Sequence, residues 1–441
     1  MPVRLLPLLT AATGAAAGML AATSAAAQQL TATDRAQAAA AVWAEAKYNY
    51  AWWDHVRADW DSALAATLRA ASEPQSDVRF YRRLRRVVAL LNDGEARVSP
   101  PTAVAGRLAR PPIALRAVEG RPFIVDYAET DELRIARPER LAEIVGVQSI
   151  PTATWIRDSV LPETAAATDA SRWTRAVERM LEGDRGTAVY LLLKLPGGAV
   201  RGASVTRSVA LNQRWPLAPP ALAADTLPDG AVWLRITDLS DPGLVKAFDR
   251  EVPDFTRVKG VILDLRDADG DTPAVGYDLL ARLTAKPFVT PRWRTPQYRP
   301  ALRAWGILDS TAVWYAAPPD TIRPVADRPP YGGPVAVLVS SRTGGAAEDF
   351  LVAFRNAARG PIIGETTAGA TGQTLAVPLV KGWTMSLCVE REAFPDGVEF
   401  GQIGIAPEMP VAEKVADFLA GRDAALEAAR AYLATRPPTR D

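Results

Sequence analysis

The segment covering residues 335–354 has the form of an acyl-transfer site. Residues 335–340 are expected to form a buried strand, residues 342–345 a tight turn, and residues 346–354 the start of a helix that closes near Gly360. A strand that enters a helix through a sharp turn can present a nucleophile beside free backbone N–H groups, which stabilise an oxyanion. Here the turn ends in Gly345, which has no side chain. The sequence therefore predicts the frame of such a site without its nucleophile.

Other side chains near this turn are poor replacements for a nucleophile or its base. Ser340 and Ser341 precede the turn, on the strand side and away from the helix dipole, and Thr343 is expected to cap the helix. His55 is the only histidine of the chain and falls in a tryptophan-rich helix, where we expect a solvated surface residue. A Ser–His–Asp triad would require this histidine.

The composition sets the broad class of the protein. The chain has 441 residues, 48% hydrophobic and 23% charged, which is ordinary for a globular protein of roughly two or three domains. A formal net charge of +1 argues against nucleic acid as a partner. The single cysteine, Cys388, cannot form an intramolecular disulfide. With no Cys/His cluster, the sequence suggests neither a zinc site nor a cofactor.

Residues 1–27 are predicted to be a cleaved signal peptide. Arg4 supplies the positive start, residues 5–22 an apolar run, and residues 25–27 a small-residue cleavage site before Gln28. A membrane anchor is the alternative, but the apolar run is short and contains glycine. We therefore expect a periplasmic or secreted protein with no integral membrane span after cleavage.

The remaining chain divides into four parts, which differ in the periodicity of their apolar residues and in their content of proline and glycine. Periodic apolar residues predict helices at 38–50, 60–71 and 78–91. After Pro100 and Pro101, short strands with one or two helices form a separate module. The predicted parts are a helical region at 28–109, the module at 110–215, an α/β core at 216–414 and an alanine-rich C-terminal helix at 415–441.

The core is expected to be an α/β domain with a mainly parallel sheet. Residues 258–266, 334–340 and 360–366 form near-continuous apolar runs, as in strands covered on both faces. A helix between the last two runs makes a right-handed crossover. Residues 375–380 and 383–390 are expected to form a hairpin that closes the edge of this sheet.

This core resembles the tail-specific (C-terminal-processing) and tricorn-type serine peptidases, especially their exported bacterial branch. Single matches would be weak, but here the family's motifs follow one another in order. In this chain they stand as Asp-Leu-Arg-Asp-Ala-Asp-Gly-Asp at 264–271 (family Asp-Leu-Arg-x-Asn-x-Gly-Gly), Thr-Gly-Gly-Ala-Ala-Glu-Asp-Phe at 343–350 (family Thr-x-Ser-Ala-Ala-Glu-Asp-Phe), Gly-Glu-Thr-Thr-Ala-Gly at 364–369, Pro-Asp-Gly-Val-Glu-Phe at 395–400 and Gly-Ile-Ala-Pro-Glu at 404–408 (family Gly-Ile-x-Pro-Asp). The resemblance implies a peptidase core of the crotonase-like ββα type and a PDZ-like module at 110–215.

The departures from the family pattern fall on the chemistry. The nucleophile position is Gly345, the histidine position in the segment 91–96 is Glu95, and the lysine position of the Ser–Lys branch is Ala370. In the oxyanion motif, Ala268 replaces Asn and Asp271 replaces the second Gly, and an acidic group there would repel an oxyanion.

The resemblance implies that a residual active site, if one is present, consists of Glu95, Gly270, Gly344, Ala346 and Glu365. We expect Glu95 to be a surface residue in a turn and Glu365 to pack near the site.

Several acidic residues could still take part. Glu348 and Asp349 lie in the first helical turn, where interaction with the helix dipole explains them without a catalytic role. By the resemblance, either Glu365 or Glu399 could complete a triad, and the sequence does not choose between them.

Loss of the nucleophile and the base together predicts a peptidase fold kept for binding an extended peptide or unfolded protein segment. Two alternatives stay open. Glu95 could act as a base on water if burial raised its pKa from the usual ~4.3, or the protein could carry apolar small molecules, as a retinoid-binding branch of this fold does.

Overall fold

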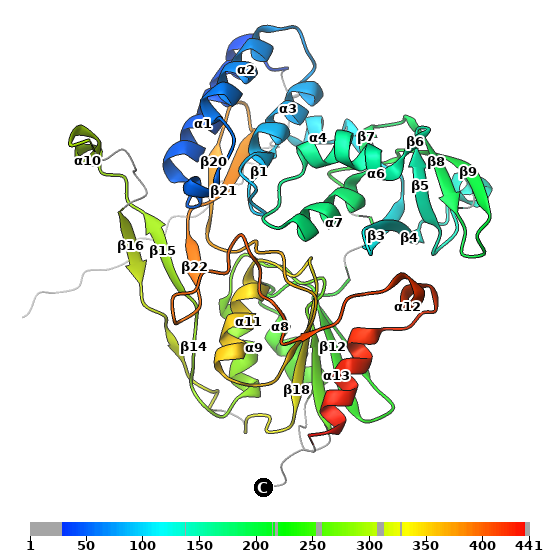
Figure 1. The fold of residues 1–441 in the computed structure, drawn as a ribbon, viewed down its shortest axis with the longest axis vertical. Coiled ribbons are helices and arrows are strands. Elements are labelled where there is room, and N and C mark those ends of the chain that lie inside the picture. The colour runs from blue at the N-terminus through cyan, green and yellow to red at the C-terminus, as the bar shows by residue number, and fades with distance from the viewer. Residues whose placement is uncertain are drawn as a thin grey trace, which may run out of the picture.

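The computed structural model describes residues 29–136, 138–213, 215–216, 219–252, 258–306, 313–326 and 329–436. The predicted signal peptide lies outside these described residues. Figure 1 shows N-terminal helices at the top, a sheet-containing module beside them and a larger α/β core below.

The N-terminal region consists of three capped helices around an apolar centre. Side chains of Thr31, Asp59 and Ser76 accept backbone N–H groups at the first turns of these helices. Phe80 and Leu84 are fully buried among them. The predicted helices are thus found, as α1 (Ala32–Asn49), α2 (Trp60–Ser72) and α3 (Asp77–Ala89), followed by β1 (Arg97–Ser99) and α4 (Thr102–Ala105).

The module after the helical region is built on one antiparallel sheet with strand order β3-β4-β5-β8-β9, and β6 (Ile150–Pro151) pairs with β5. Helix α7 (Asp169–Arg179) packs against β3, and smaller elements surround the sheet. The strands are β3 (Ile113–Val118), β4 (Arg121–Tyr127), β5 (Glu143–Val147), β8 (Ala188–Lys194) and β9 (Val200–Thr206); the smaller elements include α5 (Asp131–Ala136), α6 (Thr152–Trp155), two helical turns at Ile156–Val160 and Leu161–Glu163, and a small sheet of β2 (Leu108–Arg110), β7 (Gly183–Asp184) and β10 (Val209–Ala210).

The core is organised by a second sheet with strand order β11-β12-β13-β18-β19-β23. Only the first pair of this sheet is antiparallel; the remaining pairs run parallel. This is the mainly parallel sheet that the sequence predicts. Its strands are β11 (Leu222–Thr226), β12 (Ala231–Ile236), β13 (Gly260–Asp264), β18 (Val335–Val339), β19 (Ile362–Gly364) and β23 (Met409–Pro410).

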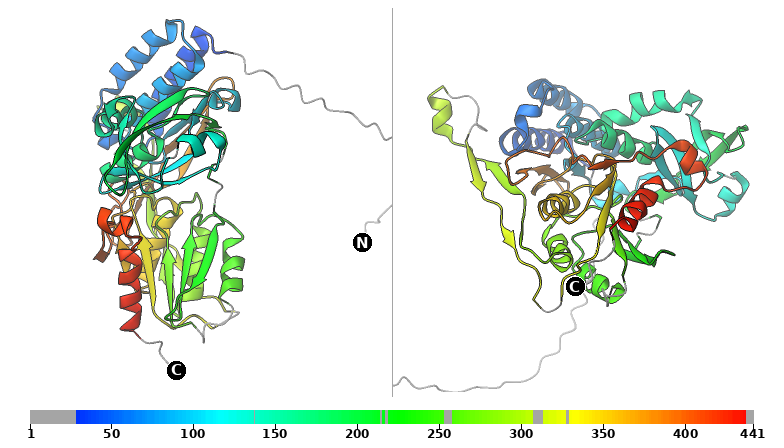
Figure 2. Two further views of the ribbon diagram at one scale, coloured as in Figure 1. Left: turned by 90° about the vertical axis from the view of Figure 1, so that its right-hand side faces the viewer. Right: turned by 60° about the horizontal axis from the view of Figure 1, so that its bottom comes forward.

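Both faces of this sheet are covered, which explains the continuous apolar runs of β13 and β18. On one face, Val261, Leu263 and Val337 belong to a cluster that includes residues of α8 (Leu244–Glu251), α9 (Ala274–Leu283) and α11 (Ala346–Asn356). On the other face, Ile262 and Leu338 pack with α13 (Ala424–Ala434). The left view of Figure 2 shows α13 and the opposite helices on the two sides of the strands.

The predicted hairpin forms, but its predicted place is wrong. Strands β20 (Thr374–Pro378) and β21 (Thr384–Cys388) pair with each other, and β21 also pairs with β1, so they form a separate three-stranded sheet. Trp383, Met385 and Leu387 are buried in the core of the N-terminal region. The apolar face of the hairpin therefore holds the helical region to the rest of the chain instead of closing the core sheet.

The C-terminal segment also differs from expectation. It forms two helices, α12 (Val415–Leu419) and α13, separated by Gly421, whose φ of +68° ends the first helix. None of the helices in the described ranges is both long and apolar enough to cross a bilayer. The remaining core elements are β14 (Phe288–Val289), β15 (Arg292–Pro296), α10 (Pro300–Ala304), β16 (Trp314–Ala317), β17 (Thr321–Ile322) and β22 (Arg391–Ala393).

Candidate functional site at the head of helix α11

The head of α11 has no room for a nucleophilic side chain. Gly345 caps the helix with φ +53° and ψ −136°, a conformation that residues with a Cβ rarely adopt. A Cβ added there would lie 2.3 Å from the carbonyl oxygen of Gly270 and 2.5 Å from Oδ1 of Asp269. Position 345 therefore has no nucleophilic side chain, and the surrounding backbone leaves no space for one.

The backbone donors expected to stabilise an oxyanion are already bound. The N–H of Ala346 donates to the carbonyl oxygen of Gly270 at 2.8 Å, and the N–H of Gly270 donates to Oδ1 of Asp269 at 2.9 Å. The N–H of Gly344 donates to the carbonyl of Ala268 at 3.1 Å. Because each N–H carries one proton, an oxyanion at this place would have to displace these acceptors.

The hydroxyl groups of the turn point to structural partners. Ser340 donates to the carbonyl of Arg266 at 2.6 Å, and Ser341 shares a hydrogen bond with Thr174 at 3.1 Å. Thr343 donates to the carbonyl of Leu265 at 2.7 Å and makes no cap to α11, so the predicted capping role is wrong. These hydroxyls hold the turn against β13 and the module.

The structure brings the three substituted family positions together. Ala370 accepts the N–H of Gly345 at 2.6 Å, and a Cβ on Gly94 would touch the Cβ of Ala370. Glu95 follows Gly94 and lines the same cavity as Gly345. The segment 91–96 therefore reaches the head of α11 from the N-terminal region, although it is far away in sequence.

Glu95 is not the surface residue that the sequence predicts. Its side chain is 8% exposed, and its backbone N–H donates to Asp93 at 2.9 Å. Burial raises the pKa of Glu95 from 4.5 to about 7, and the neighbouring carboxylates Asp269 and Asp93 add to this rise. Glu95 can therefore exchange a proton near neutral pH.

A cavity of about 350 Å³ opens beside Gly345 and Ala346. Its lining includes two aromatic residues, Tyr277 and Trp293, and the residues 372–374 at the start of β20. We call it the acidic cavity, because it is also lined by Glu95, Asp271, Asp320, Asp349, Glu390 and Glu392.

Two of these carboxyl groups are held in unusual electrostatic surroundings. Asp349 is 5% exposed, and its atom Oδ1 has no hydrogen-bond partner. Burial raises the pKa of Asp349 well above its ordinary value, and the charge and hydrogen bond of Glu392 raise it further. Burial and Glu392 likewise raise the pKa of Glu390 to about 7. Glu392 itself accepts a short hydrogen bond from Thr371.

Other acidic candidates lie outside the cavity lining. Glu348 is fully buried and accepts hydrogen bonds from Thr367 and the N–H of Gly369, while burial raises its pKa to about 8. The carboxylate of Glu365 accepts the N–H of Glu413 at 3.4 Å, so the structure does not bring Glu365 into the cavity.

Glu399 is bound by Arg294 at 2.5 Å and by Arg391 at 3.6 Å, which leaves it as an ion-pair partner. His55 lies in the helical turn Trp53–His55 and is exposed, which agrees with the solvated surface residue that the sequence predicts.

Sequence reasoning missed most of the acidic cavity. From the sequence, the helix dipole is a sufficient explanation for Asp349, and no motif marks Glu390 or Glu392. One signal is the spacing of two residues between Glu390 and Glu392, which places two side chains on one face wherever the chain is extended. The approach of Tyr277 and Trp293 depends on how α9 and β15 are placed, for which the sequence has no local signal.

Within the described residues, no group of three or more His, Cys, Asp or Glu side chains is arranged to hold a metal ion.

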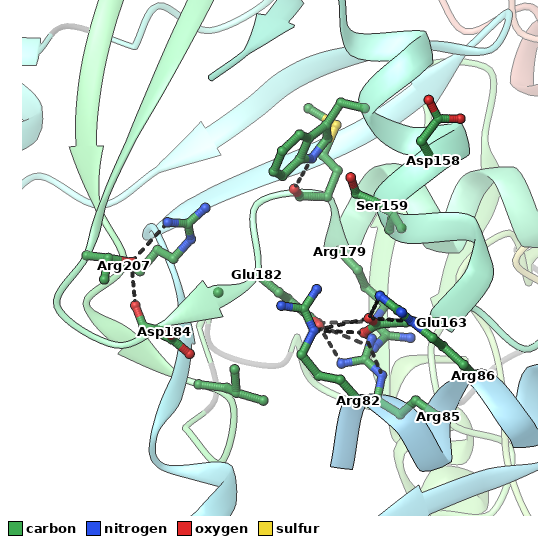
Figure 3. A pocket seen from close by; sticks show the side chains of 16 residues that line it. Arg82, Arg85, Arg86, Asp158, Ser159, Glu163, Arg179, Glu182, Asp184 and Arg207 are labelled. Carbon is green, nitrogen blue, oxygen red and sulfur yellow. Dashed lines mark hydrogen bonds and ion pairs between the residues drawn. The ribbon is translucent and has the colours of Figure 1, made fainter. Parts of the chain in front are cut away.

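A second cavity lies between α3 and the module, and a group of ion pairs lies in its wall (Figure 3). Glu163 binds Arg82 and Arg86, both at 3.1 Å, and Glu182 binds Arg85 at 3.2 Å and Arg179 through Oε1 at 3.1 Å. These ion pairs join the helical region to the module.

Comparison with known proteins finds a family match for the core. Residues 232–411 match the model of Peptidase family S41. A curated relative is the chloroplastic C-terminal processing peptidase of Tetradesmus obliquus, which is 24% identical over 255 residues, or 54% of this chain. The chain spans about half of that relative's length (49%).

Solved structures share the fold over most of the chain. Mature CPAF complexed with lactacystin superposes with a TM-score of 0.71 at 17% identity, covering 92% of this chain and 97% of that chain. The photosystem II D1 C-terminal processing protease superposes with a TM-score of 0.50 at 18% identity, covering 86% of this chain and 93% of that chain. The ordered motifs and the match at residues 232–411 thus show that the core is similar to Peptidase family S41, and the solved structures show that the chain shares the fold of CPAF and of the D1 C-terminal processing protease.

Proposed function

We propose that this protein is an exported S41-fold protein that binds extended peptides or unfolded protein segments at the acidic cavity and does not cleave them by a serine mechanism. The observation that carries the proposal is the closed head of α11, where Gly345 lacks both a nucleophile and room for one. The N–H of Ala346 is also bound to Gly270, so the electrostatic part of the mechanism is blocked as well.

Peptide binding is supported by the sheet edge next to the cavity. Strand β20 pairs with β21 on one side only, within the described residues, and its first residue, Thr374, lines the cavity. An unpaired strand edge offers backbone N–H and C=O groups to an added strand. Two of the proteins named above, the Tetradesmus obliquus relative and the photosystem II D1 protein, are a C-terminal processing peptidase and a C-terminal processing protease, which act on protein chains. Export rests on the signal peptide predicted for residues 1–27, and the module at 110–215 is proposed to be PDZ-like.

The proposal is tested with mature protein and unfolded peptide substrates. Calorimetry is expected to show saturable binding, mass spectrometry of the peptides no cleavage, and a fluorophosphonate probe no covalent adduct. An acyl or phosphonyl adduct on any side chain of the protein would overturn it. N-terminal sequencing of protein from the exporting cell checks the cleavage before Gln28.

A second candidate function is hydrolysis with Glu95 as a base acting directly on water. It is favoured by one observation: Glu95 is buried in the same cavity as Gly345 and its pKa is raised to about 7, where a carboxylate is most useful as a base. Peptide turnover that disappears in Glu95→Gln and survives in Asp271→Asn, another carboxylate of the lining, would establish it. An apolar cargo has less support, because it would desolvate the carboxyl groups of this cavity.

A further inference from the structure

The acidic cavity is unbalanced in charge. Six carboxyl groups line it, and no Lys, Arg or His is among the described residues that do so. They come from separate parts of the chain, including the turn after α3, the first turn of α11 and strand β22. At the second cavity, by contrast, the buried carboxylate of Glu163 is matched by Arg82 and Arg86. Among the described residues that line it, the acidic cavity has no such cationic partner for its carboxyl groups.

Asp349 independently indicates that the carboxyl groups of the cavity are meant to be paired with a bound ligand. Its side chain is nine-tenths buried (5% exposed), lines the cavity, and leaves Oδ1 without a hydrogen-bond partner. A buried acceptor without a partner is costly, so such groups are rare in folded proteins. A ligand that donates hydrogen bonds and carries positive charge would satisfy it.

The rest of the lining favours an organic cation over a metal ion. Tyr277 and Trp293 present aromatic surface to the cavity, and aromatic faces attract ammonium and guanidinium groups. The carboxyl groups form no metal-binding cluster among the described residues. The volume of about 350 Å³ lies in the range of small ligand sites and accommodates one long side chain.

We propose that the acidic cavity binds the ammonium or guanidinium group of a lysine or arginine side chain in a peptide laid along the free edge of β20. Residues 372–374 connect the two features, since they line the cavity and lead into the strand. The inference rests on the proposed peptide-binding function and adds its specificity. A free diamine carries the same chemistry and is the alternative source of the cation.

The test uses isothermal titration calorimetry with the mature protein and ten-residue Gly/Ser/Ala peptides that carry one central Arg, Lys or citrulline. Citrulline keeps the shape of arginine and removes its charge. The Arg and Lys peptides are expected to bind roughly ten- to a hundredfold more tightly than the citrulline peptide, as for a hydrogen bond to a charged group.

Variants connect this preference to the cavity. The double variant Asp349→Asn with Glu390→Gln is expected to reduce the preference for the charged peptides to less than about threefold. If the double variant does not fold, Glu390→Gln alone is measured instead; it changes a partly buried site and is expected to reduce the preference in part. Glu427→Gln removes a half-exposed carboxylate on α13 and is expected to leave the preference unchanged.

The outcomes separate the two proposals. Equal binding of all three peptides would overturn the cation inference and leave peptide binding intact. A third outcome is that agmatine or 1,5-diaminopentane binds, that the double variant loses this binding, and that no peptide binds. This outcome would support the cation site and overturn the proposed peptide function. If neither peptides nor amines bind, both proposals are wrong.

Discussion

The backbone N–H of Ala346 donates a hydrogen bond to the carbonyl oxygen of Gly270 at 2.8 Å, at the place where an acyl-transfer site would hold its oxyanion. Formation of this bond fixes the head of α11 against the loop that follows β13. It also places the carbonyl of Gly270 where a side chain on Gly345 would have to go. The position of the Gly270 carbonyl therefore accounts for both losses: it occupies the space of a nucleophilic side chain, and it binds the N–H group that would stabilise an oxyanion.

Substitution of Gly345 measures this closure. Gly345→Ala is expected to lower the free energy of unfolding by about 1–3 kcal/mol, because the new Cβ meets Gly270 and the backbone has a positive φ. Gly344→Ala is the matched control: its Cβ would have its nearest neighbour at 3.6 Å, an ordinary contact, and should cost less than about 1 kcal/mol. Equal denaturant midpoints for the two variants would show that the turn opens freely.

Restoring the family residues is not expected to restore the enzyme. In Gly345→Ser with Glu95→His, the donors of Gly270 and Ala346 remain bound within the turn, so an oxyanion gains little stabilisation. We expect no labelling by a fluorophosphonate probe and no peptide cleavage. Stoichiometric labelling of the introduced serine would contradict this and show that the head of α11 rearranges.

The stability contributed by Glu95 should depend on pH. Its pKa is raised in the folded state from 4.5 to about 7, so the folded protein binds more protons than the unfolded chain between these values. Stability from this group is therefore full below pH 4.5 and falls as the pH rises to 7, by an amount on the order of 3 kcal/mol.

Melting temperatures of wild type and Glu95→Gln at pH 5 and pH 8 check this effect. The variant should gain stability relative to wild type as the pH rises. A difference that is the same at both pH values would mean that Glu95 is solvated.

Asp349 is expected to reduce stability at neutral pH. Its raised pKa means that the unfolded chain releases a proton that the folded state retains, which favours unfolding above pH 4. Asp349→Asn removes this cost and should increase the unfolding free energy by about 1–3 kcal/mol at pH 8, with little effect at pH 4. Urea unfolding at the two pH values measures the gain, and a loss of stability at pH 8 would show that Asp349 is paired.

Trp383 tests the role of the β20–β21 hairpin. It is 1% exposed and packs against Phe80 and Tyr81 of α3. Trp383→Ala should cost about 3–5 kcal/mol and make the N-terminal helices accessible to protease. Trp305→Ala, at a side chain that is 74% exposed, is the control and should change stability by less than about 0.5 kcal/mol. Similar effects of both substitutions would argue against this packing.

The local elements of the site were predictable. The apolar run at 335–340, the glycines of the turn and the periodic helix at 346–354 depend on short-range preferences, and they form as β18, Gly345 and α11. The missing nucleophile is a matter of residue type, so the sequence alone determined it. Because the hairpin turn at 381–382 is also local, β20 and β21 were predicted, but their partner strand β1 was not.

The sequence by itself thus determined the resemblance of the core to a peptidase family, its parallel sheet and the absence of a serine at position 345. Tertiary structure decided that Glu95, Asp349 and Glu392 line one cavity and that Ala346 donates to Gly270. The physical reason is distance along the chain: pairing and burial of residues separated by hundreds of positions depend on packing of whole elements, and the pKa of a carboxyl group follows from that burial.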